Sequence, residues 1–156
     1  MKKLNHYISR FLEFFTLFSS AAFIGVVLLQ IFARFALESA PSWTEEAARI
    51  FFIYTISFAS GLALHGKYYV QMDIVYNLLA VQWQKLLDVI NALLVFILFG
   101  IMVVYSLNFI QLGIVETSPS LRIPMAFPFG SMFIMSGFIC YYSILDFISA
   151  FKALRS

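Results

Sequence analysis

Residues 89–115 read VINALLVFILFGIMVVYSLNFIQLGIV, a run of 27 residues between Asp88 and Glu116 that contains no charged side chain. An α-helix rises about 1.5 Å per residue, so roughly 20 apolar residues cross the ~30 Å hydrocarbon core of a bilayer. Backbone groups in lipid find hydrogen-bond partners only within a helix or a closed barrel. The stretch therefore predicts a transmembrane helix.

Three further uncharged blocks lie along the chain, with lengths of 20, 17 and 23 residues at positions 14–33, 50–66 and 123–145. The whole chain is 62% hydrophobic and 12% charged, whereas soluble domains are about half apolar and a quarter charged. These blocks predict an all-α integral membrane protein with four transmembrane helices. We expect one membrane domain over 1–156, with helices at about 11–34, 43–66, 86–115 and 124–148.

Lysine and arginine are distributed unevenly over the expected loops. With a cytoplasmic N-terminus, seven of the ten would face the cytoplasm, while Arg34, Arg49 and Arg122 would face outward. Positive residues concentrate in cytoplasmic loops, which predicts that both termini are cytoplasmic. Residues 70–85 have apolar residues at helical spacing and end near Trp83. They fit an interfacial helix on the cytoplasmic surface or an extension of the third transmembrane helix.

The sequence contains no catalytic or cofactor motif. The single cysteine, Cys140, and the two histidines, His6 and His65, offer neither a zinc motif nor paired haem ligands at one depth. A net charge of +2 without a basic stripe argues against nucleic acid as a partner. All acidic residues lie at block edges, and we interpret Glu13, beside Arg10, as a helix-start residue. We expect no catalytic residue, cofactor or metal. A standalone four-helix exporter and a haem or quinone membrane anchor stay open as alternatives.

A charge cluster, PSWTEEAAR, precedes the second block. Ser42 and Glu45 match the S-x-x-E capping box of a helix N-terminus. Glu45 and Arg49 form an i,i+4 pair in the favourable order, and Trp43 suits the membrane interface. This interpretation leaves Glu46 without a comparable role.

Small residues four positions apart occur in three of the blocks. This spacing lets membrane helices approach closely. The pairs that we expect at helix contacts are Ala21 with Gly25, Ser57 with Gly61, and Ser136 with Cys140.

Four segments follow one another along the chain: Arg34, SWTEEAAR (42–49), GLALHGKYYVQMDIV (61–75) and SPSLRIPMAFPFG (118–130). Together they resemble the small membrane subunit of TRAP transporters. In that family a W-x-E-E-x-x-R segment opens the second helix, a G-x-x-x-H-x…D stretch follows where that helix ends, and a proline-bearing segment precedes the last helix.

The resemblance implies a non-catalytic scaffold subunit in a bacterial inner membrane. Such a subunit packs against a large multi-helix permease (M) subunit, works with a soluble periplasmic substrate-binding protein, and is surrounded by membrane lipid. The transporters of this family import organic acids, such as dicarboxylates or sialic acid, with a sodium gradient. The candidate partner-interface residues are Arg34, Trp43, Glu45, Glu46, Arg49, His65 and Asp73.

Overall fold

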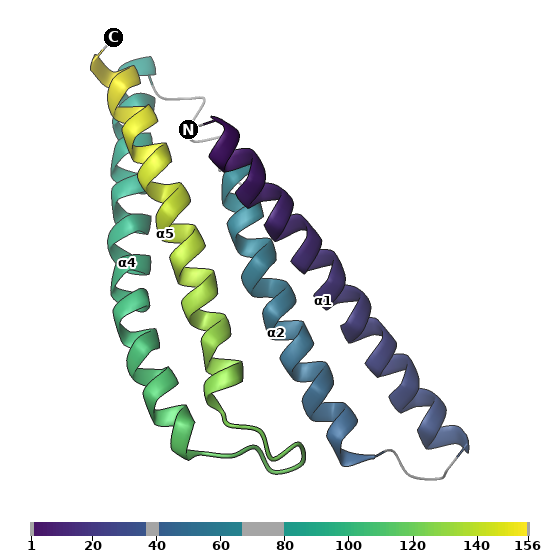
Figure 1. Ribbon diagram of the computed structural model, residues 1–156. Helices are drawn as coiled ribbons and strands as arrows, with labels where there is room; N and C mark the ends of the chain where they lie inside the picture. Colours follow the sequence, from purple (N-terminus) through teal and green to yellow (C-terminus); the bar gives the residue numbers. More distant parts are fainter. Residues whose placement is uncertain (1, 37–40, 67–79, 156) are drawn as a thin grey trace.

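The computed structural model describes residues 2–36, 41–66 and 80–155. Across these ranges the chain forms the helices α1 (Lys2–Ala36), α2 (Ser42–His65), α4 (Val81–Val115) and α5 (Ala126–Arg155), shown in Figure 1. Each of the four is long and apolar enough to cross a membrane. The prediction of an all-helical chain with four membrane-spanning helices is confirmed.

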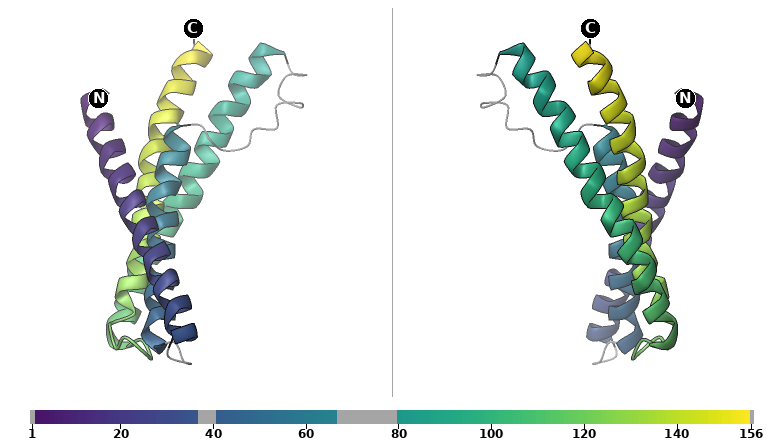
Figure 2. Two further views of the ribbon diagram at one scale, coloured as in Figure 1. Left: turned by 90° about the vertical axis from the view of Figure 1, so that its right-hand side faces the viewer. Right: turned by 90° about the vertical axis from the view of Figure 1, so that its left-hand side faces the viewer.

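The helices form a row rather than a closed bundle. α5 packs against both α4 and α2, and α2 packs against α1, so α1 and α4 are the two edges (Figure 1). These edge helices spread apart toward the end with the chain termini in the view of Figure 2 but toward the opposite end in Figure 1, so they run at an angle to each other. Within the most apolar stretch of each helix, 6% of the residues are buried in α1 and in α4, whereas 28% are buried in α2 and in α5. Most of each edge helix therefore faces the surroundings.

The apolar core lies where α1, α2 and α5 meet. Leu12, Phe58 and Tyr142 are its buried members. Close approach there depends on Gly61, because a Cβ at this position would lie 3.0 Å from the Phe138 Cβ and 3.2 Å from the Leu12 Cδ1. Small residues at such crossings allow helix axes to approach each other.

Hydroxyl groups connect the helices near the end with the chain termini. Tyr141 of α5 donates a 2.8 Å hydrogen bond to the Asn5 Oδ1 of α1. Ser143 of α5 donates one of 2.7 Å to the carbonyl of Ala92 in α4. These bonds set the depth of α1 and α4 relative to α5, which apolar contact alone does not fix.

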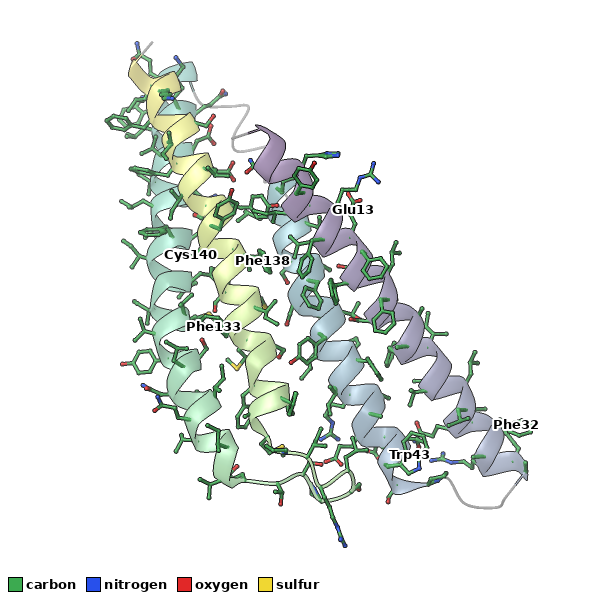
Figure 3. The ribbon with its side chains drawn as sticks, viewed as in Figure 1. Glu13, Phe32, Trp43, Phe133, Phe138 and Cys140 are labelled. Atoms are coloured by element: carbon green, nitrogen blue, oxygen red, sulfur yellow. The ribbon has the colours of Figure 1, made fainter. Side chains whose placement is uncertain are left out.

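The structure bears on two expectations about where helices begin, those for Glu13 and for the segment 70–85. The interpretation of Glu13 as a helix-start residue is wrong, because α1 begins eleven residues earlier, at Lys2. Glu13 is exposed on α1 (Figure 3). Of the segment 70–85, residues 70–79 lie outside the described residues, whereas residues 81–85 belong to α4.

Candidate functional site

The connection between α4 and α5 has a defined shape. Thr117 and Pro124 form an antiparallel bridge, and the Ser118 N–H donates to the Ile123 carbonyl at 2.9 Å. Arg122 is exposed and has a φ of 54°, in the left-handed region that non-glycine residues seldom adopt. We call residues 116–125 the α4–α5 loop, and the end of the row that contains it the loop end.

Glu46 of α2 holds this loop. Its Oε2 accepts the backbone N–H of Ser120 at 3.1 Å and that of Leu121 at 2.7 Å. Hydrogen bonds to an ionised carboxylate are shorter and stronger than neutral ones. The nearby hydroxyl of the buried Ser118 and these two amides hold the pKa of the Glu46 carboxyl below its ordinary value, and of these donors only the amides form hydrogen bonds to it. Glu46 thus ties the start of α2 to a loop more than 70 residues later in the chain.

A second hydrogen bond links α2 to the segment that follows the loop. The Tyr54 hydroxyl of α2 donates a 2.8 Å hydrogen bond to the Phe127 carbonyl in the first turn of α5. On the other side of α5, the end of α4 comes so close that a Cβ at Gly113 would lie 2.5 Å from the Ala126 nitrogen. The start of α5 is therefore fixed from both neighbouring helices.

The predicted capping box is not formed. The N-cap of α2 is Pro41, and no side chain caps the helix. Proline has no N–H for a glutamate to bind, so the second half of a capping box cannot form there. Ser42 is instead the first helical residue, and the buried Thr44 donates its hydroxyl proton to the Pro41 carbonyl at 2.7 Å.

The predicted pair of Glu45 and Arg49 is present. The Arg49 Nη2 lies 3.7 Å from the Glu45 Oε1, and the two side chains are 71% and 72% exposed. Exposed pairs of this kind contribute little to stability, about 0.3–0.5 kcal/mol. These charges are therefore available to other molecules, whereas Glu46 is engaged within the chain.

The remaining predicted site residues are divided between the two ends of the row. Trp43 is partly exposed at the loop end (Figure 3), and the exposed Arg34 lies in the last turn of α1 at the same end. His65 lies at the opposite end, where its ring stacks on Tyr142 with centroids 4.8 Å apart. Asp73 lies outside the described residues.

Sequence reasoning did not identify the partners of Glu46. Its donors are backbone amides, which every residue except proline provides, so no residue type marks them. The only signal is indirect, since Pro119 and Pro124 restrict the loop that presents those amides.

The buried residues of the described ranges are apolar or carry hydroxyl groups, and none is charged. Four apolar spans around such an interior define a multi-pass membrane protein. Comparison with known proteins identifies its family, because residues 23–153 match the DctQ component of the tripartite ATP-independent periplasmic (TRAP) transporters. The chain belongs to this family and is a TRAP transporter component.

Two relatives support this assignment. A protein of Haemophilus influenzae, named as a TRAP transporter small permease protein, is 26% identical over 114 residues, which is 70% of this chain and 69% of the relative. The isethionate TRAP transporter permease protein DctMQ of Oleidesulfovibrio alaskensis is 31% identical over 93 residues. That match covers 58% of this chain but 15% of the relative. The resemblance found in the sequence is confirmed.

Proposed function

We propose that the chain is the non-catalytic scaffold subunit of a sodium-driven, binding-protein-dependent importer of organic acids. The observation that carries this proposal is the uncharged interior of the described helices. A route for a carboxylate substrate needs polar or charged groups to replace its water, whereas the buried residues of the described helices are uncharged and several of their hydroxyl groups are bonded within their own helix. The substrates that we propose are carboxylates such as dicarboxylates or sialic acid.

The partner that we propose is a large permease (M) subunit, with a periplasmic substrate-binding protein as the third component. The similarity to part of a much longer protein named DctMQ supports this pairing. The excess of lysine and arginine in the expected cytoplasmic segments supports an orientation with both termini inside, and the membrane that we propose is a bacterial inner membrane. The loop end would then face the periplasm.

Within this proposal, the exposed residues at the loop end contact a partner. Trp43, Glu45 and Arg49 are free for such contact by their exposure, whereas Glu46 first shapes the loop. Glu45→Ala should lower uptake per inserted copy without lowering the thermal midpoint. Glu46→Ala should lower uptake and also loosen the loop. Wild-type uptake by Glu45→Ala would remove this residue from the interface.

The decisive experiment is reconstitution in proteoliposomes. The small and large subunits together should take up a labelled organic acid only when the binding protein and an inward sodium gradient are both present. Omission of the small subunit should abolish uptake. Solute flux by the small subunit alone would contradict a scaffold role and favour a standalone transporter.

A further inference from the structure

Three of the exposed polar residues of the edge helix α4 lie on one side of that helix. Asn91, Tyr105 and Asn108 are all exposed, and Tyr105 is 61% exposed. Within the described ranges none of their side chains makes a hydrogen bond. Leu94, Leu98 and Ile101 are also exposed. Together with the three polar residues they follow one another along α4 at intervals of three and four residues. This spacing keeps them on one side of the helix and is the spacing of a helix–helix packing seam.

The separation of the two asparagines means that lipid headgroups cannot reach both. They are 17 positions apart, which is about 25 Å along a helix, and any tilt makes the depth difference smaller. The hydrocarbon core is about 30 Å thick. Side chains lean toward the N-terminus of their helix, which shifts both amides in the same direction and leaves their separation unchanged. At least one amide therefore lies at hydrocarbon depth, where acyl chains offer no hydrogen bond.

The opposite edge of the row has a different character. On α1, every exposed residue between Phe14 and Phe32 is apolar or a glycine. Acyl chains can cover that surface without leaving a polar group unpaired. The two edges are equally open, so their chemistry, rather than their exposure, distinguishes them.

We propose that this seam of α4 is the surface on which a transmembrane helix of the large permease subunit docks. The docking helix would carry serine, threonine, asparagine or glutamine side chains at the depths of Asn91 and Asn108, because neutral amides pair with neutral donors and acceptors. The identity of the occupant rests on the proposed function. In the DctMQ relative the similar segment is 15% of a single chain, which favours one large partner over a second copy.

Site-specific crosslinking tests the proposal with a matched pair of positions. A photoreactive residue replaces Leu98, at the centre of the seam, or Leu28 on α1, and these leucines are 56% and 60% exposed. In membranes that contain both subunits, Leu98 should give a small–large adduct at least tenfold more abundant than Leu28. Equal yields at the two positions, or an adduct between two small subunits at Leu98, would overturn the proposal.

Substitution tests the amides themselves. Asn91→Leu with Asn108→Leu makes the chain more apolar, so membrane insertion should not fall. Recovery of the large subunit with the tagged small subunit should drop about 3- to 10-fold for each amide at hydrocarbon depth, and Asn108→Gln should retain more of it than Asn108→Leu. Unchanged recovery of the double variant would refute the seam. If even the wild-type chain recovered no large subunit, the proposed function would fail as well.

Discussion

Gly113→Ala should destabilise the protein through a collision with backbone atoms. Gly113 is buried near the end of α4, where a Cβ would lie 2.5 Å from the Ala126 nitrogen and 2.7 Å from the Met125 carbonyl carbon. Ordinary contact begins near 3.4 Å, so the start of α5 would have to move by about 0.9 Å (3.4 − 2.5). That segment is also held by the Tyr54 hydroxyl, which opposes such a movement.

The magnitude follows from two opposing effects. Overpacking of a close contact costs about 1–3 kcal/mol, and backbone atoms cannot rotate away, which favours the upper half of this range. Alanine regains about 0.8–1 kcal/mol through its higher helix propensity. The net loss is about 1–2 kcal/mol, which corresponds to a thermal midpoint lowered by roughly 2–8 °C at this chain length.

Gly100→Ala is the matched control on the same helix. A Cβ there meets no atom within 4 Å, so the variant keeps only the gain in helix propensity, and its midpoint should equal or exceed that of the wild type. Thermal unfolding of the purified protein in detergent micelles, followed by tryptophan fluorescence, measures both variants. Equal midpoints for Gly113→Ala and Gly100→Ala would refute the close approach of α4 and α5.

Three smaller changes probe the loop end. Tyr54→Phe removes one hydrogen bond to a backbone carbonyl and should cost about 0.5–1.5 kcal/mol in the same unfolding assay; an unchanged midpoint would mean that this bond contributes nothing. Glu46→Gln replaces a charged acceptor with a neutral one, so hydrogen exchange at the two loop amides should speed up, while protection equal to wild type would show that other groups hold the loop. Glu45→Ala breaks an exposed pair with Arg49 and should shift the unfolding free energy by less than about 0.5 kcal/mol; a larger shift would indicate a structural role for that pair.

Hydrophobic block length predicts the spans because the bilayer imposes one thickness on every crossing helix. It does not predict their arrangement. The pair of Ser57 and Gly61 lies buried at a helix contact, whereas a Cβ at Gly25, at the same spacing from Ala21, would meet no atom within 4 Å. Spacing shows where close approach is possible, but which helices become neighbours depends on contacts between distant segments.

The site shows the same division between local and distant contacts. The pair of Glu45 and Arg49 is an interaction within one helix turn, and it was predictable from spacing alone. The capping box failed because one residue, Pro41, occupies the N-cap. The role of Glu46 depends on loop amides far along the chain, which no local pattern identifies.

The hydrogen bonds of the buried hydroxyl groups and those between helices suit the scaffold role that we propose for the row of helices. Several buried hydroxyls bond within their own helix, as Ser57 does to the Ile53 carbonyl and Ser136 to the Met132 carbonyl. They therefore need no partner. The ties between helices lie near the two ends of the row, at Glu46 and at Tyr141, so the helices are fixed relative to one another before any partner binds. The seam of α4 is therefore held in one position relative to the other helices. Binding of a docking helix would then cost little conformational entropy on the side of this chain.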